Sequence, residues 1–135
     1  MQAFIVKLEH RPGSMADLAE ALGEKGINIT GISAVGWDAS GAVGLITSDE
    51  GGTRSVLDQR DADYREAELV AAALEDRPGQ LGVATRRLAE VGINIEAIIP
   101  TGMSSSGMMV AFAVDDPSAA REALGQLAAV GSQPV

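Results

Sequence analysis

A duplication restricts the fold of this sequence more than any other feature. Arg11-Pro12-Gly13 returns as Arg77-Pro78-Gly79, and Gly26–Ile29 (Gly-Ile-Asn-Ile) returns at the same spacing as Gly92–Ile95. That spacing also aligns Leu8-Glu9 with Leu74-Glu75, Leu22 with Leu88, Glu24 with Glu90, Ile32 with Ile98, Gly41 with Gly107 and Asp49 with Asp115. A period of about half the chain predicts a duplicated domain, because a solenoid needs three or more short units. We expect one module at 1–66 and another at 67–135.

Within each copy, hydrophobic period and turn residues predict the order strand–helix–strand–strand–helix–strand. Ala3–Leu8 alternates as a strand does, and Ser14–Asp17 resembles a capping box that opens an amphipathic helix ending near Gly26. The other elements expected are a hairpin of Ile27–Val35 and Ala42–Thr47 around the turn 38–41, a weak helix at Gly51–Gln59, a helix N-capped by Asp116 with Pro117 in its first position, a hairpin turn at Ser104–Gly107, and closing strands near Tyr64–Glu68 and Gly131–Val135.

This order is the ferredoxin-like βαββαβ pattern, so we predict an α+β protein with two such modules in tandem. With helices on one side only, each sheet keeps a free face, and its edge strands lack partners. Pairing the sheets edge to edge, within the chain or between chains, hides those edges. We therefore expect edge-to-edge paired sheets and a homodimer.

Composition excludes several classes of function. The sequence has no cysteine, so it offers no disulfide, thiolate nucleophile or sulfur ligand for a metal. Its formal charge of −9 opposes binding to a phosphate backbone, so nucleic acid is not an expected partner. Its apolar runs are too short to cross a bilayer, so no membrane partner is expected. The first residues also lack the pattern of a secretory signal, which predicts a cytoplasmic protein.

The repeated motifs resemble the ACT domain. In both copies a strand leads into Arg-Pro-Gly, a helix follows, and Gly-Ile-Asn-Ile opens the next strand; His10–Ile29 and Asp76–Ile95 match most closely. This resemblance implies small regulatory modules that bind amino acids or related metabolites at interfaces between paired modules. It also implies a regulated target on a separate polypeptide, a metabolic enzyme or a regulator.

The motif suits a zwitterion, which needs hydrogen-bond donors for its carboxylate and an acceptor for its ammonium group. Gly13 and Gly79 let a ligand approach the backbone, and the N–H groups that follow open a helix. Asn28 and Asn94 each carry an amide that both donates and accepts, and the resemblance places this residue opposite the loop of another module. The predicted ligand-binding residues are His10, Arg11, Pro12, Gly13, Ser14, Met15, Asn28, Ile29, Asp76, Arg77, Pro78, Gly79, Gln80, Leu81, Asn94 and Ile95.

The two loops differ in the residue before Arg-Pro-Gly, whose side chain contacts the ligand in the resembled family. That residue is His10 in the first copy and Asp76 in the second. An ionised aspartate suits an ammonium group, which favours the Asp76 loop as the better site. The expected pairs are the His10–Met15 loop with Asn94 and the Asp76–Leu81 loop with Asn28, within one chain or across a dimer.

Simpler interpretations stay open. Arg-Pro-Gly is also an ordinary tight turn before a helix, so a module that only mediates protein interactions would carry the same motif. The sequence offers no acid–base pair, metal cluster, hydrolase motif or phosphate-binding loop, so no catalytic residue, metal or cofactor is predicted. For Trp37, Met103, Met108 and Met109, a core or dimer contact is favoured over a ligand wall.

Overall fold

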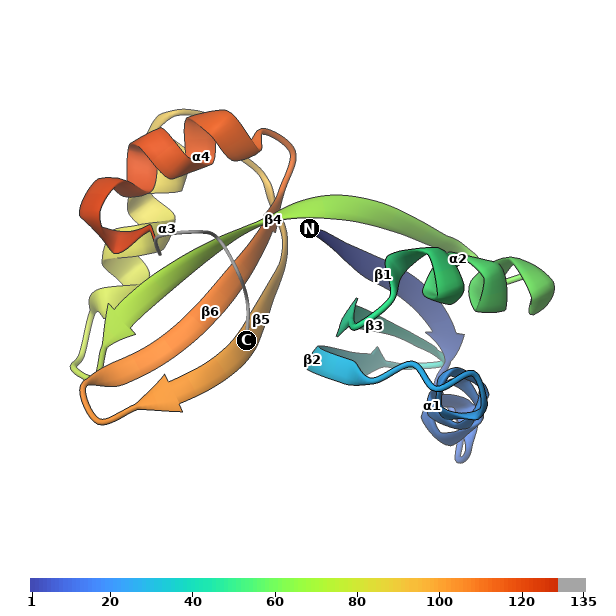
Figure 1. The fold of residues 1–135 in the computed structure, drawn as a ribbon. Coiled ribbons are helices and arrows are strands. Elements are labelled where there is room, and N and C mark those ends of the chain that lie inside the picture. Colours follow the sequence, from blue (N-terminus) through green and yellow to red (C-terminus); the bar gives the residue numbers. More distant parts are fainter. Residues whose placement is uncertain (129–135) are drawn as a thin grey trace. The chain divides into compact units, whose positions relative to one another are not determined.

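The computed structural model describes residues 1–128 and confirms the predicted α+β order of elements (Figure 1). Gln2–Glu66 form one compact unit, the first module, and the second unit begins at Ala67 and includes Met1. The elements of the first module are β1 (Gln2–Glu9), α1 (Ser14–Glu24), β2 (Ile29–Trp37), β3 (Ser40–Thr47) and α2 (Glu50–Gln59), followed by the start of β4 (Tyr64–Glu75).

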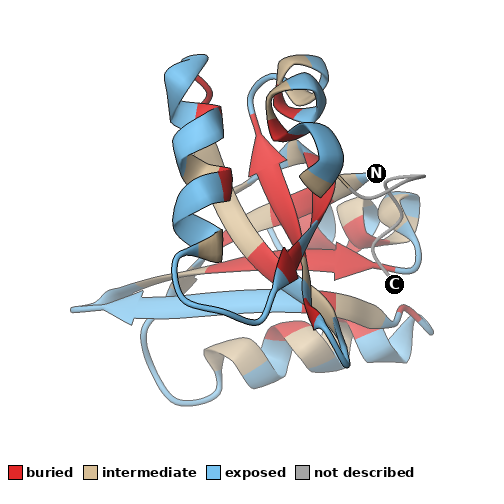
Figure 2. Cartoon of the chain, turned by 90° about the vertical axis from the view of Figure 1, so that its left-hand side faces the viewer, coloured by how far each residue is buried: buried red, intermediate tan, exposed pale blue. Residues whose placement is uncertain are grey.

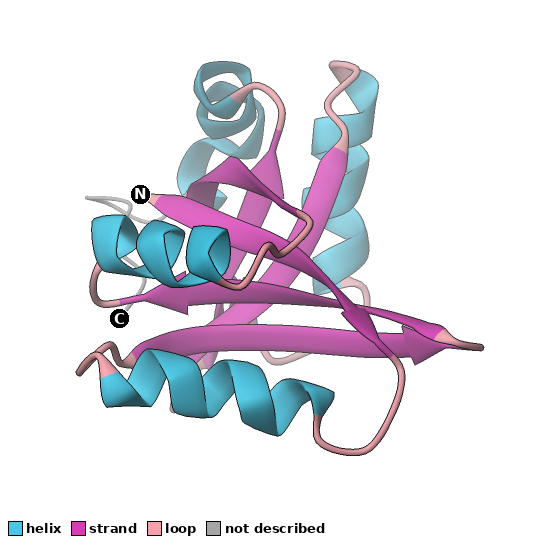
Figure 3. Ribbon diagram, turned by 90° about the vertical axis from the view of Figure 1, so that its right-hand side faces the viewer, coloured by secondary structure: helices cyan, strands magenta, loops and turns pink. Residues whose placement is uncertain are grey.

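The second module repeats this order. After β4 come α3 (Gln80–Glu90), β5 (Ile95–Ser104), β6 (Gly107–Val114), α4 (Pro117–Leu124) and a single 3₁₀ turn, Gly125–Leu127. The closing strand predicted near Tyr64–Glu68 is longer than expected, because β4 continues without a break into the first strand of the second module. The other closing strand, predicted at Gly131–Val135, lies outside the described residues. Short loops join the helices and strands (Figure 3).

Strand pairing in the first module follows the order β2-β3-β1-β4, and in the second module β4-β6-β5. β1 and β2 both run antiparallel to β3, so they are parallel to each other. In the same way β4 and β5 both run antiparallel to β6, so they are parallel to each other. Successive side chains of a strand point to opposite faces, so every ladder sends alternate residues toward the helices.

Each module has its own apolar core between its sheet and its two helices. Buried positions lie on the strands and on the inner faces of the helices, whose outer faces are exposed (Figure 2). The first core contains Phe4, Val6, Leu18, Leu22, Ile27, Val43, Leu45, Val56 and Leu57. The second contains Val70, Ala72, Leu74, Ala84, Leu88, Ile93, Val110, Phe112, Val114, Ala120 and Leu124. The alternation read from Phe4, Val6 and Leu8 is therefore the alternation that fills the first core.

The helix N-termini fall into two kinds. α2 and α4 are capped by aspartates: the carboxylate of Asp49 accepts the N–H of Gly52 at 2.9 Å, and that of Asp116 accepts the N–H of Ala119 at 3.1 Å. The N-cap predicted at Asp116 is thus confirmed. The capping box predicted at Ser14 is wrong, because Gly13 is the N-cap of α1 and Ser14 is already helical. Gly79 begins α3 in the same way.

The hairpins of the two modules differ by one residue. In β5 the register slips between Pro100 and Gly102, so that strand holds a residue that β2 lacks. As a result Gly41 lies opposite Leu8, whereas Met108 lies opposite Leu74. The alignments of Gly41 with Gly107 and of Asp49 with Asp115 are therefore wrong by one position. The structural partner of the Asp49 cap is Asp116.

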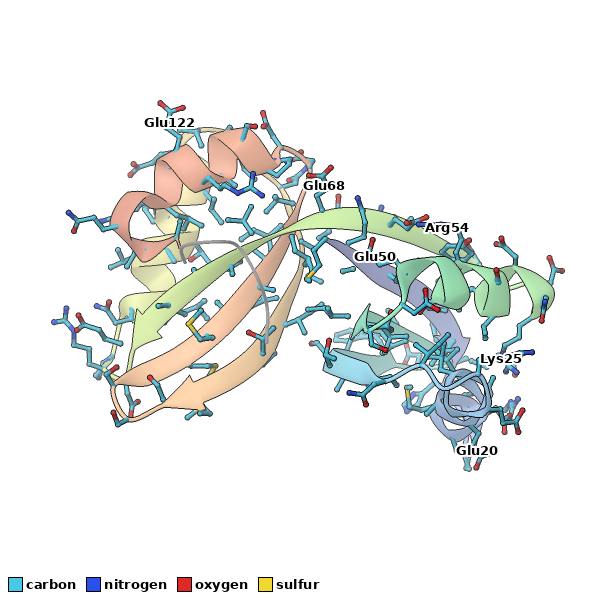
Figure 4. All side chains as sticks on the ribbon, in the orientation of Figure 1. Glu20, Lys25, Glu50, Arg54, Glu68 and Glu122 are labelled. Carbon is cyan, nitrogen blue, oxygen red and sulfur yellow. The ribbon has the colours of Figure 1, made fainter. Side chains whose placement is uncertain are left out.

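An ion pair fixes α2 to the sheet of the first module. The guanidinium of Arg54 donates to both carboxylate oxygens of Glu66, with Nε at 2.9 Å and Nη2 at 2.6 Å, and lies 5.9 Å from the ring centroid of Phe4. This hydrogen bonding lowers the pKa of the Glu66 carboxyl and raises that of Arg54. Figure 4 labels Arg54 on α2. Within residues 1–128, no helix is long and apolar enough to span a membrane.

Candidate functional site

The Arg-Pro-Gly loops have the same backbone geometry in both modules. Gly13 has φ 91° and Gly79 has φ 89°, a left-handed conformation that other residues rarely adopt. The loop of the first module joins the end of β1 to α1, and the loop of the second joins the end of β4 to α3. The glycine in each motif is therefore required by the turn that starts the helix.

These turns leave donors unpaired at the start of α1 and α3. The N–H of Asp17 already bonds the carbonyl of Gly13 at 2.8 Å, but the N–H groups of Met15 and Ala16 have no acceptor among the described residues. In α3, the N–H groups of Leu81 and Gly82 have none within residues 1–128 either. An anion is favoured at such a helix start, because the free N–H groups and the helix dipole both attract negative charge.

His10 connects the first loop to the hairpin of β2 and β3. Its backbone N–H donates to the carbonyl of Ala39 at 3.0 Å, and its Nδ1 lies 2.8 Å from the carbonyl oxygen of Asp38. A carbonyl only accepts, so Nδ1 carries a proton and Nε2 of the neutral ring is an acceptor. The ring lies on Gly36, where an ideal Cβ would be 2.7 Å from both Cε1 and Nε2. Only glycine at position 36 leaves room for the imidazole.

The two arginines of the motif are turned back onto the preceding glutamates. Nε of Arg11 donates to Glu9 at 2.9 Å, and Nε of Arg77 contacts Glu75 at 2.8 Å. Arg11 also approaches the carboxylate of Asp17 at 3.9 Å. All these side chains are more than half exposed, so their attraction is screened by water.

A cavity of about 200 Å³ lies beside the first loop. Four of the predicted site residues line it: His10, Arg11, Ser14 and Met15. The hairpin positions around 33–38, where side-chain selectivity is expected from the sequence, supply Ala34 and Gly36, whereas the wall at Gly41 of β3 was not predicted. The available signal was a pair of glycines on either side of the hairpin turn, because two residues without side chains leave a recess at the end of a sheet.

The corresponding end of the second module is chemically different. The ladder places Met103 opposite Met108, where the first module places Gly36 opposite Gly41. Met103 is 76% exposed and Met108 37% exposed. The backbone N–H of Asp76 donates to Ser106 at 3.0 Å, as the N–H of His10 does to Ala39, but the Asp76 side chain is exposed. The second loop thus lies beside two methionines instead of two glycines.

The asparagines lie away from the loop of their own module. Asn28 precedes β2 and the His10 loop follows β1, so the parallel direction of these strands puts them at opposite ends of the sheet. Asn94 and the Asp76 loop are separated in the same way. The backbone N–H of Asn28 donates to Ser48 Oγ at 2.9 Å, and that of Asn94 donates to Asp115 at 3.2 Å. A site that joins a loop to an asparagine therefore needs two modules.

The remaining predicted residues divide between core and surface. Ile29 packs on the first core and Ile95 on the second, so each anchors the start of its own strand. Pro12 and Pro78 are exposed in their loops, and Leu81 is 47% exposed at the start of α3. Gln80 is the first residue of α3 and is partly buried.

Solved structures share this fold. Protein BT0572 from Bacteroides thetaiotaomicron matches with a TM-score of 0.73 and 19% identity, over 91% of this chain and 85% of that chain. The ligand-free regulatory subunit of aspartate kinase from Thermus thermophilus matches at 0.65 and 19% identity, over 93% and 90%. A structure of aspartokinase alpha and beta subunits matches at 0.68 and 22% identity, over 93% and 91%. No family model and no curated protein match the sequence. At these identities the likeness establishes the fold.

Proposed function

We propose that this chain, a tandem ACT-type pair by its fold, is a regulatory protein that binds an amino acid and transmits its occupancy to another polypeptide. The fold is shared with the regulatory subunit of an aspartate kinase, which supports a regulatory role without catalysis. In this proposal the chain works as a homodimer in the cytoplasm, and its target is a separate metabolic enzyme or regulator. The bound amino acid is the signal.

One observation carries the proposal: the helices after the two repeated loops lack side-chain caps, and the other two helices have them. Asp49 and Asp116 already occupy the N-termini of α2 and α4. The helices α1 and α3 have glycines as N-caps, and no group in residues 1–128 accepts the N–H groups named above. A ligand carboxylate satisfies those groups as an aspartate cap does, and it gains from the helix dipole.

The ammonium group of the ligand needs an acceptor near the same helix start. In the first loop Nε2 of His10 is such an acceptor in the neutral form of the ring, because the bond to Asp38 holds a proton on Nδ1. In the second loop Asp76 supplies a carboxylate. We propose that Asn94 and Asn28, provided by the opposite modules, complete the two sites by bridging both ends of the zwitterion.

Backbone amide NMR of the dialysed full chain tests this proposal. We expect one or a few of the twenty amino acids to shift the amide signals of Met15 and Ala16 or of Leu81 and Gly82 in a saturable way. The amides of Gly52 and Ala119 serve as internal controls, because aspartates already cap them. If every amino acid leaves all four free amides unmoved at millimolar concentration, the chain is better explained as an interaction module.

A further inference from the structure

A second hollow, which borders the loop cavity, lies on the outer face of the first module, the face turned away from α1 and α2. Two rows of paired residues cross it. Lys7 pairs with Ala42 and Ala42 with Val35, and in the next row Glu9 pairs with Ser40 and Ser40 with Trp37. Directly paired residues point to the same face of a sheet, and this face is opposite that of Val6 and Leu8.

The three strands give this hollow a floor and two unlike walls. Small side chains on β3, Ala42 and Ser40, form the floor. Val35 and Trp37 of β2 form an apolar wall, and Lys7 and Glu9 of β1 form a charged wall. The cavity measures about 530 Å³, within the range of small-molecule sites. The second module does not repeat it, because Ala73, Met109 and Gly102 stand in the row of Lys7, Ala42 and Val35.

Both walls hold groups that are available to a ligand. Trp37 is 79% exposed and Val35 66% exposed, although both are large and apolar. The Lys7 ammonium lies 3.6 Å from Asp63, but both side chains are more than three-quarters exposed, so a ligand carboxylate can replace Asp63 at little cost. Glu9 bonds Arg11 through Oε2, which leaves its other carboxylate oxygen as an acceptor.

We propose that this hollow is a second amino-acid site, selective for a zwitterion with a large apolar side chain. The ligand carboxylate binds Lys7. Its ammonium lies above Ser40, between the Glu9 carboxylate and the face of the Trp37 ring, where ion pairing and the cation–π attraction act together. Its side chain covers Ala42 and packs on Val35. The inference rests on the proposed amino-acid sensing and adds a second place where that signal is read.

A second copy of the chain fits this surface less well. A two-fold contact would place the same surface on both partners, so another group of this same face would have to enter the recess above Ala42 and Ser40. Stable interfaces instead pack as densely as protein interiors and bury about 800 Å² on each partner. An amino acid enters the recess and satisfies both charges of the β1 wall.

The fluorescence of Trp37 gives a direct test, because Trp37 is the single tryptophan of the chain. L-leucine should change its emission in a saturable manner, and glycine should not, because glycine has no side chain to pack on Val35. Isoamylamine lacks the carboxylate and 4-methylpentanoate lacks the ammonium, so each should bind at least about tenfold more weakly than leucine. Equal affinity of leucine, isoamylamine and 4-methylpentanoate would overturn the proposal.

Variants locate the site. Ala42→Leu fills the floor and Lys7→Met removes the cation, and each should weaken the leucine response at least about tenfold while keeping the melting temperature near that of the parent. Ser33→Leu is the matched control, because Ser33 lies on the same face of β2, one row beyond the hollow, and should leave the response unchanged. Unchanged leucine binding by both Ala42→Leu and Lys7→Met would contradict the assignment.

The same experiments separate this inference from the loop site. Five residues border both cavities, so amide NMR must accompany the fluorescence; they are Leu8, Glu9, Val35, Gly41 and Ala42. Loop amides that shift while Trp37 emission stays constant would leave the proposed function standing and refute the hollow. Trp37 emission that depends on protein concentration without ligand, together with a doubled mass in sedimentation, would assign the face to a second copy and also refute it. A leucine response lost in Ala42→Leu but kept in Gly36→Ala supports the hollow.

Discussion

At the scale of single residues, the two modules differ most at the end of the sheet beside each loop. Gly36 and Gly41 leave a recess in the first module, and the imidazole of His10 lies in it. Met103 and Met108 occupy the equivalent ladder positions in the second module. When the two loop sequences are compared, charge alone favours the Asp76 loop. The geometry instead favours the His10 loop, because a cavity lies beside it and the His10 ring is held in place by its bond to the carbonyl of Asp38.

Gly36→Ala tests the packing of His10. A Cβ at this position would lie 2.7 Å from the imidazole, so the ring must leave its place and its bond to Asp38. We expect a loss of about 1–3 kcal/mol in the free energy of unfolding, measured in urea. Gly23→Ala in α1 is the control: among the described residues the added Cβ would meet no atom within 4 Å beyond its own helix backbone, so the change should raise stability by about 0.5 kcal/mol. A neutral Gly36→Ala would contradict the described contact.

Glu66→Gln tests the Arg54 pair through pH. The hydrogen bond from Arg54 lowers the pKa of Glu66 in the folded state, so the charged form stabilises the fold above the pKa of the unfolded chain. That contribution is lost as the pH falls through the folded-state pKa. We expect the melting temperature of the parent to fall more steeply with acid, below about pH 5, than that of Glu66→Gln. Glu20→Gln should behave like the parent, and equal slopes for parent and Glu66→Gln would refute the coupling.

At the scale of elements, hydrophobic periodicity and the turn and cap residues predicted the helices and strands wherever local sequence determines them. Asp116-Pro117 predicted the start of α4 correctly, and alternation predicted the inner residues of β1. The extra residue at Thr101 escaped prediction, because a bulge forms where the pairing of two strands requires it and leaves no fixed sequence mark. The recess at Gly36 and Gly41 was not predicted although both glycines flank the expected hairpin turn, because only the register shows that they lie opposite each other.

The helix caps give a prediction at this scale. Asp49→Ala and Asp116→Ala should each cost about 1 kcal/mol of unfolding free energy, because each leaves one N–H group at a helix start without its acceptor. Ser14→Ala should change stability by less than about 0.5 kcal/mol, because Ser14 is the first helical residue of α1 and its side chain caps nothing. Urea unfolding measures all three. If Ser14→Ala cost as much as the aspartate changes, Ser14 would be acting as a cap, as the capping box predicted.

At the scale of the whole molecule, duplication explains why one chain offers two loops and two asparagines. Each asparagine lies at the far end of the sheet from its own loop, so the proposed sites, which join a loop to an asparagine, need two modules. The repeat could be read from sequence because the glycine turns and Gly-Ile-Asn-Ile are local. Which module faces which loop depends on the assembly of modules, and no local pattern encodes that.

The double variant Asn28→Ala with Asp76→Ala tests sites shared between modules. Both residues are exposed, so we expect the melting temperature without ligand to change by no more than a few degrees. Amino-acid binding measured by calorimetry should be abolished at the Asp76 loop. Glu90→Ala, an exposed change on α3, is the control and should bind as the parent does. Unchanged affinity in the double variant would refute the assignment of the shared site.

The central claim, that this chain senses an amino acid, is tested most directly by a thermal-shift panel of the twenty amino acids on extensively dialysed protein. Ligand at about 100 times its dissociation constant should add about 2.7 kcal/mol of stability, which raises the melting temperature by several degrees. We predict a dose-dependent rise with one chemical class of amino acid. A flat panel at millimolar concentration would contradict the claim and identify the chain as an interaction module.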